Sequence, residues 1–163
     1  MIADMNEKKI RLADLHDLPK DIKDLSYEEC DELCRDIRRT IVRTVMKNGG
    51  HLSSNLGTVE LIVAMHRVFD SPEDKFVFDV GHQAYTHKLL TGRLSDFPKL
   101  RKENGLSGFT RPSESEHDAF ISGHSSTSVS AALGMAEAMK LSGDNVHHAI
   151  AVIGDGALTG GMA

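Results

Sequence analysis

The chain has 163 residues, 40% hydrophobic and 26% charged, so one domain with a sizeable apolar core is expected. Its net charge is −5 and its Lys and Arg residues are scattered, which argues against nucleic acid or an anionic membrane as a partner. Cys30 and Cys34 lie four residues apart within a predicted helix, where ordinary disulfide geometry is not met. A reducing cytoplasm is therefore the expected location.

The first segment, residues 1–25, is predicted to be an extended leader on the surface, because Asp and Pro interrupt its isolated apolar residues. It contains neither the apolar core of a signal peptide nor a membrane span. A helix is predicted from Ser26, which can form a capping box with Glu29, to the Asn48-Gly49-Gly50 sequence. Residues 26–163 are then expected to form one partial domain.

A polar loop over residues 51–57 precedes a second predicted helix at Thr58–Phe69, which is apolar on almost every side and should be deeply buried. The short apolar run Lys75–Val80 is typical of a strand in a parallel sheet. Gly81-His82-Gln83 follows it, and a helix is expected from there through Leu90.

Residues 95–122 are rich in Gly, Ser, Pro and charge, and a loop of this length is expected to be either functional or mobile. A helix of small residues should begin after Gly123 and end near Gly143, followed by a strand from His148 to Ile153. The resulting β-α-loop-α-β order predicts an α/β fold with a parallel sheet and right-handed crossovers.

Three loops are expected at the edge of the sheet where open α/β folds bind ligands. They are Gly81-His82-Gln83, Gly123-His124-Ser125 and Gly154-Asp155-Gly156. The second precedes a helix, whose free N–H groups favour a phosphate, although Ser125 could equally be an ordinary N-cap.

Asp155 follows an apolar strand and is flanked by two glycines, with Gly160-Gly161 beyond. A carboxylate in this position can serve as a turn residue, but the flanking glycines favour a site for a metal and a diphosphate. Mg²⁺ takes one or two carboxylates together with phosphate oxygens and water. The turn lacks the later glycine of the dinucleotide fingerprint, and the chain has no P-loop.

Three histidines, His51, His82 and His124, lie in small polar loops where an imidazole could exchange protons near neutral pH. The alternative is that each is a hydrogen-bonded loop residue. Their spacing does not predict a zinc site.

Several consecutive segments resemble the amino-terminal part of the 1-deoxy-D-xylulose-5-phosphate synthase family, and the resemblance covers roughly residues 10–163. The matching segments are Asn48–Gly57, Phe78–Arg93, Gly105–Phe109, Ser113–Asp118, Gly123–Ser128 and Gly154–Ala163. The resemblance implies the thiamine diphosphate-binding fold of the transketolase superfamily. It also implies an enzyme that condenses pyruvate with glyceraldehyde 3-phosphate and releases CO₂, on the route to isoprenoid precursors and thiamine.

The resemblance also assigns roles to individual residues. Asp155 would be a Mg²⁺ ligand, His82 would contact the thiamine diphosphate, and His51 would face the substrate as a proton carrier or orienting donor. Gly154 and Asp155 are also expected to bind the cofactor. The residues expected against its diphosphate are Gly123, His124, Ser125, Gly156 and Ala157.

In the family, the motif at Asp155 continues to an Asn that also binds the metal, and a pyrimidine-binding domain supplies a Glu. We therefore expect this chain to be truncated at its carboxyl end and inactive alone, and to form a homodimer or higher oligomer through its uncovered apolar surface. Two alternatives remain open. The chain could be one half of a split transketolase-like enzyme, or a non-catalytic association module.

Overall fold

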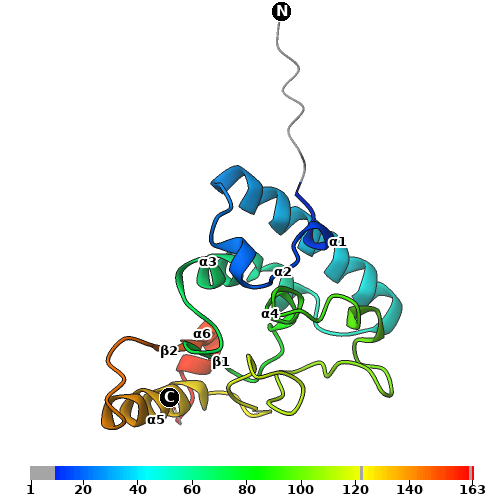
Figure 1. Cartoon of the computed structure of the whole chain (residues 1–163). Coiled ribbons are helices and arrows are strands. Elements are labelled where there is room, and N and C mark those ends of the chain that lie inside the picture. Colours follow the sequence, from blue (N-terminus) through cyan, green and yellow to red (C-terminus); the bar gives the residue numbers. More distant parts are fainter. Residues whose placement is uncertain (1–9, 122, 162) are drawn as a thin grey trace, which may run out of the picture.

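The computed structural model describes residues 10–121, 123–161 and 163. Its centre is a parallel pair of strands, β1 (Lys75–Phe78) and β2 (Ala149–Val152), in a register that aligns Lys75 with Ala149 and Phe78 with Val152. Helices lie on both faces of this pair (Figure 1). The predicted α/β fold with a parallel sheet is confirmed.

The first helix, α1 (Tyr27–Asn48), begins and ends where the sequence predicts. Ser26 accepts a hydrogen bond from Glu29 N–H while the Glu29 carboxylate accepts one from Ser26 N–H, so the capping box is present. Gly49 ends the helix with a φ of +78°, a conformation that favours glycine. The apolar residues at helical spacing are buried against α3 and α4, namely Leu33, Cys34, Ile37, Ile41 and Val45.

The prediction of a loop over residues 51–57 is wrong in part, because Ser53–Leu56 form a short helix, α2, that leads into α3 (Val59–Val68). The prediction that this apolar helix is deeply buried is wrong for one of its faces, since Leu61 is 51% exposed and Val68 is 67% exposed. Only the face with Ile62, Val63 and His66 is buried. The apolar composition of a helix reports its total hydrophobicity, whereas burial depends on how many neighbours its position in the fold supplies.

The helix after β1, α4 (Tyr85–Leu90), is buried along its whole length. Together with α3 it covers the face of the sheet that carries Phe76 and Phe78, whose rings contact His66 and His87. The opposite face is covered by α5 (Ser128–Leu141), which packs on both strands.

The long segment after α4 contains one short 3₁₀ helix, η3 (Phe97–Lys99). Asn48 donates to the backbone oxygens of Pro98 and Leu100, so the segment is fastened to the end of α1. Further along, Asp118 is buried and paired with Arg93. The described part of this loop is therefore held by specific contacts.

The part of the expected leader that the structure describes contains two 3₁₀ turns, η1 (Leu12–Asp14) and η2 (Lys20–Ile22). Leu12, Ile22 and Leu25 belong to the main apolar core. Residues 1–9 of the expected leader lie outside the described residues. Within the described part of the chain, no helix is both long enough and apolar enough to cross a membrane.

Candidate functional site

Asn55 in α2 joins the two loops that carry His51 and His82. Its side-chain amide donates to the backbone oxygen of His51 at 2.7 Å and to that of His82 at 2.8 Å. Its Oδ1 accepts from Tyr85 N–H at 2.8 Å, at the start of α4. Asn55 is completely buried, so these bonds hold three backbone segments together without competition from water.

The His51 and His82 rings lie edge to face, with centroids 5.4 Å apart, and the Phe109 ring lies 5.8 Å from His51. Both imidazoles are half-buried, and Nδ1 of each is a buried atom without a hydrogen-bond partner among the described residues. Burial, with smaller effects from His82 and Arg101, lowers the pKa of His51. Burial therefore favours the neutral imidazole of His51, whose unprotonated ring nitrogen can accept a hydrogen bond or a proton.

The chain turns sharply between β1 and His82. Gly81 N–H donates to Asp79 O at 2.7 Å, which closes a three-residue turn around Val80. Val80 has a φ of +61° and Gly81 a φ of +88°. A positive φ is uncommon for a β-branched residue, and such strain persists only where the surrounding contacts over-determine the backbone.

Asp79, at the start of the turn, makes two hydrogen bonds that fix its position. Its buried carboxylate accepts from Ser126 N–H at 3.0 Å and from Ser128 N–H at 3.1 Å, at the amino end of α5. Burial alone would raise the pKa of Asp79, but these hydrogen bonds outweigh burial and lower it. Asp79 therefore caps α5 from a strand that precedes it by almost fifty residues.

The hydrogen bonds of Asp79 change the expectation that the N–H groups at the start of α5 bind a phosphate. Two N–H groups at the start of α5 already donate to Asp79, so they are not free for a ligand. A phosphate would instead meet the exposed residues before the helix, Gly123, His124 and Ser125. Ser125 is not the N-cap of α5, because the helix begins at Ser128 and Thr127 precedes it.

Ser126 joins the Gly123–Ser125 loop to the Gly154–Gly156 loop. Its hydroxyl donates to Ala157 O at 2.7 Å, in the short helix α6 (Asp155–Leu158) that follows β2. Gly160 packs against the same serine, where a Cβ would lie 2.7 Å from Ser126 Cβ. The Gln83 side chain donates to Val152 O at 3.2 Å, and this bond joins the His82 loop to the end of β2.

The structure thus brings the predicted site residues to the carboxyl edge of the parallel sheet. Gly154, Asp155 and Gly156 are exposed there, Ala157 is half-buried, and Gly154 precedes α6 as its N-cap. No group of three His, Cys, Asp or Glu side chains among the described residues could hold a metal ion. The residues present fit a metal–diphosphate pair, in which one carboxylate is completed by phosphate oxygens and water.

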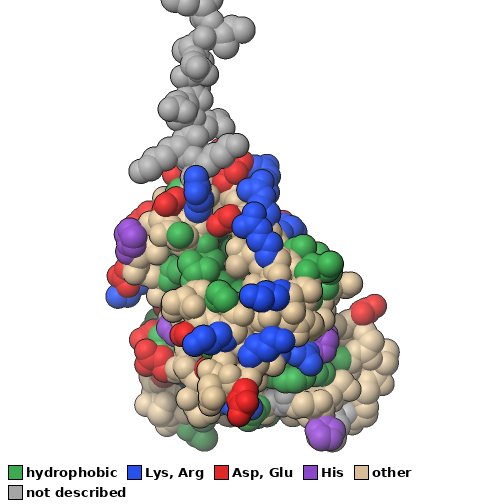
Figure 2. Space-filling view, turned by 90° about the vertical axis from the view of Figure 1, so that its right-hand side faces the viewer, with side chains coloured by type: hydrophobic (Ala, Val, Ile, Leu, Met, Phe, Trp, Pro, Cys, Tyr) green, Lys and Arg blue, Asp and Glu red, His purple; other side chains and the backbone are tan. Residues whose placement is uncertain are grey.

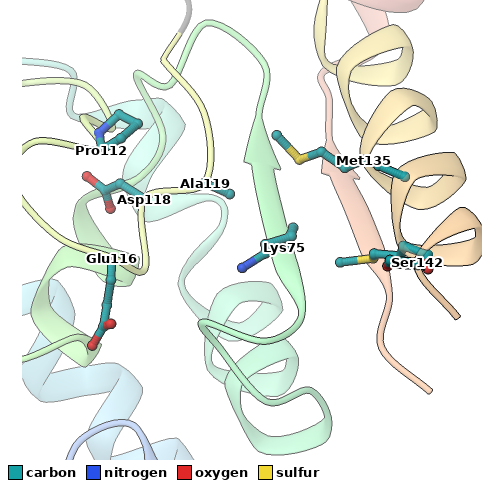
Figure 3. A pocket seen from close by; sticks show the side chains of 9 residues that line it. Lys75, Pro112, Glu116, Asp118, Ala119, Met135 and Ser142 are labelled. Carbon is teal, nitrogen blue, oxygen red and sulfur yellow. Dashed lines mark hydrogen bonds between the residues drawn. The ribbon is translucent and has the colours of Figure 1, made fainter. Parts of the chain in front are cut away.

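A separate cavity of about 630 Å³ lies away from these loops, between α5 and the segment around Pro112–Ala119 (Figure 3). One wall is apolar, with Met135 pointing from α5 toward β1, and the other carries Lys75 and Glu116. None of the predicted site residues lines it.

Sequence reasoning missed the three residues that assemble the site, Asn55, Asp79 and Ser126. One of them carried a usable signal, since Asp79 follows an apolar strand as Asp155 does, and a buried carboxylate needs donors. Nothing in the local pattern around Asn55 or Ser126 distinguishes them from ordinary loop residues.

The model of the 1-deoxy-D-xylulose-5-phosphate synthase family matches residues 13–163. A 1-deoxy-D-xylulose-5-phosphate synthase of Thermus thermophilus is 61% identical over 145 residues, which are 89% of this chain and 23% of that protein. The corresponding proteins of Thermomicrobium roseum and Pelotomaculum thermopropionicum are 62% identical over 148 residues and 56% identical over 153 residues. Those matches cover 90% and 94% of this chain, and 23% and 24% of the two relatives.

This chain therefore belongs to the 1-deoxy-D-xylulose-5-phosphate synthase family and corresponds to its amino-terminal part. It spans less than a quarter of the length of these curated relatives.

Replacing Asp79 with Asn should lower the free energy of unfolding by about 2 kcal/mol at pH 7, because the amide has one acceptor oxygen where the carboxylate uses two. The native pKa of Asp79 is lowered, so its stabilising effect is complete above the unfolded pKa of about 3.9 and is lost as the pH falls through the native pKa. Urea unfolding of the unmodified chain and of Asp79→Asn between pH 7 and pH 3 measures the difference in their unfolding free energies. A difference in stability that stays constant over that range would contradict the assignment.

Replacing Gly160 with Ala should displace Ser126 and weaken its bond to Ala157, for a loss of about 1 kcal/mol in unfolding free energy. Gly161→Ala is the matched control, because a Cβ at Gly161 meets no atom within 4 Å. Thermal unfolding of the two variants beside the unmodified chain makes the comparison. Equal melting temperatures for the two variants would show that Ser126 does not depend on the glycine.

Proposed function

We propose that this chain forms the diphosphate-binding part of a 1-deoxy-D-xylulose-5-phosphate synthase that uses thiamine diphosphate and Mg²⁺. The observation that carries the proposal is the hydrogen bond from Ser126 to Ala157. It places the Gly123–Ser125 loop beside the Gly154–Ala157 loop at one edge of a parallel sheet. Asp79 fixes the same serine from the end of β1.

In this proposal Asp155 binds Mg²⁺, because it is the exposed carboxylate between two glycines at that edge. The diphosphate lies against the backbone and side chains of the two loops. Its contacts come from Gly123, His124, Ser125, Gly154, Gly156 and Ala157. Glycine at these positions lets backbone N–H groups approach an anion closely.

His82 contacts the cofactor, and His51 faces the substrate. The thiamine diphosphate supplies the acidic carbon of its thiazolium ring when bound. The protein supplies proton acceptors at defined positions, and the neutral His51 is suited to this role because its surroundings disfavour the imidazolium ion. The Nδ1 atoms of both histidines find no hydrogen-bond partner in the described part of the chain, which supports the view that a ligand completes their hydrogen bonding.

The proposed substrates are pyruvate and glyceraldehyde 3-phosphate, with 1-deoxy-D-xylulose 5-phosphate and CO₂ as products. We propose that the complete enzyme acts in the cytoplasm as a homodimer or higher oligomer. The free thiols of Cys30 and Cys34 agree with a reducing compartment.

A second candidate, a non-catalytic association module, is favoured by one observation. Large apolar side chains on and near α5 are exposed, with Leu133 at 62%, Leu141 at 86% and Val146 at 75%. Apolar side chains also reach the surface in several groups on the face shown in Figure 2. Exposed apolar surface of this kind is typical of an interaction site.

Calorimetric titration of the chain with thiamine diphosphate, with and without Mg²⁺, tests the proposal. We expect saturable binding that depends on Mg²⁺ and is lost in Asp155→Ala, because the remaining described residues offer no cluster that could hold the ion. Glu137→Ala, at an exposed position on α5, is the control and should bind as the unmodified chain does. Absence of binding, with concentration-dependent self-association, would favour the association module.

We also expect the purified chain to form no 1-deoxy-D-xylulose 5-phosphate from pyruvate and glyceraldehyde 3-phosphate, even with the cofactor and Mg²⁺ present. One carboxylate leaves most of the coordination of Mg²⁺ to ligands that can exchange freely, so the cofactor would not be held in a fixed position. A coupled assay for CO₂ release, with product analysis by mass spectrometry, measures this. Product formed by the chain alone would overturn the expectation.

A further inference from the structure

Four charged side chains cluster outside the candidate site, and all of them except the half-buried Glu114 are buried. Lys88 in α4 and Arg93 just after it face Glu114 and Asp118 from the long loop. Arg93 donates to both Asp118 oxygens at 2.8 Å, and Lys88 donates to both Glu114 oxygens, at 2.6 and 3.0 Å. The side chains of Lys88 and Asp118 are completely buried, so each needs the opposite charge.

Each carboxylate of this cluster also accepts a backbone N–H from an earlier part of the same loop. Glu114 Oε1 accepts from Ser107 N–H at 3.0 Å, and Asp118 Oδ2 accepts from Arg111 N–H at 2.7 Å. The five-residue segment 107–111 is therefore held at both ends by side chains that are themselves anchored to α4 and Arg93.

The residues between those two ends reach the candidate site. The Phe109 ring lies 5.8 Å from the His51 ring. Thr110 is buried and donates to Phe120 O at 2.8 Å, and it packs on Gly81, where a Cβ would come within 3.1 Å of the Thr110 hydroxyl. The segment thus rests on His51 and on the turn that presents His82.

We propose that Glu114 and Asp118 are positioning residues that hold Phe109 against His51 and so keep His51 partly screened from water. The side chains that face His51 are His82 from the turn after β1, Arg101 from the loop after η3, and Tyr85 from α4, whose hydroxyl accepts from His51 N–H at 3.4 Å. None of these side chains carries a carboxylate, so the lowered pKa of His51 comes from burial and from neighbouring cationic groups. Glu114, Asp118 and Phe109 lie outside the loops proposed to bind the cofactor, so their effect on His51 can be measured without cofactor.

The pKa of His51 shows whether Glu114 acts by holding the segment 107–111 or only through its negative charge. Removing the Glu114 carboxylate without moving the loop would lower the His51 pKa further, because a negative charge would be lost. Releasing the loop would expose His51 and raise its pKa toward the ordinary value of about 6.5. The two mechanisms predict opposite signs.

The experiment is an NMR pH titration of the His51 ring in the full 163-residue chain, with the signal assigned by His51→Gln. We expect Glu114→Ala and Phe109→Ala each to raise the His51 pKa by about 0.5. The control Glu116→Ala, at an exposed position two residues from Glu114, should leave it unchanged. A His51 pKa that falls or stays constant in Glu114→Ala would overturn the proposal.

Amide hydrogen exchange on the unmodified chain gives a second measurement that does not depend on a variant folding. The Ser107 and Arg111 amides should be protected to the same degree as the backbone amides of α4, because both are anchored to the buried cluster. Exchange at these two amides as fast as at the amide of exposed Glu103, whose N–H makes no hydrogen bond among the described residues, would also overturn the proposal.

Discussion

The carboxylate of Asp79 is buried at the carboxyl end of β1, where a charge is tolerated only if donors surround it. Its donors are the N–H of Ser128, the first residue of α5, and the N–H of Ser126 just before this helix, which follows the long loop. The pairing satisfies both partners, since helix amino ends carry unpaired N–H groups and a positive dipole. It also fixes Ser126, and through Ser126 the loop that carries Asp155. The candidate site therefore depends on one buried charge that takes no direct part in it.

The polar groups at the sheet edge separate into two sets. Asn55, Asp79 and Ser126 are buried, and their hydrogen bonds join backbone segments that are distant in sequence. Gly123, His124, Ser125 and Asp155 are exposed at the edge that those bonds create. The cofactor binding proposed above would need rigid support beneath donors and acceptors that stay accessible, and this division provides both.

The long loop is held by a different kind of interaction. It buries few large apolar side chains after Leu106, and its position depends on carboxylates paired with Lys88 and Arg93. Burial would raise the pKa of Asp118, but the hydrogen bonds from His87 and Arg93 lower it well below its usual range. Buried ion pairs are directional, so they can fix the place of a loop that lacks the regular hydrogen bonds of a helix or a strand.

The local sequence was sufficient to predict α1, α3, α4, α5, the two strands and the three glycine loops, but not the short helices α2 and α6. These features depend on residue spacing, on capping residues such as Ser26 and on glycines such as Gly49, all of which act within a few residues. Tertiary structure alone decided which side chains hold the loops together. Asp79 reaches Ser126 across 47 residues, and Asn55 reaches His82 across 27. It also decided that Leu61 and Val68 remain exposed on an apolar helix. Such pairings and exposures follow from the distances that the packed fold sets between elements, and no short sequence pattern encodes those distances.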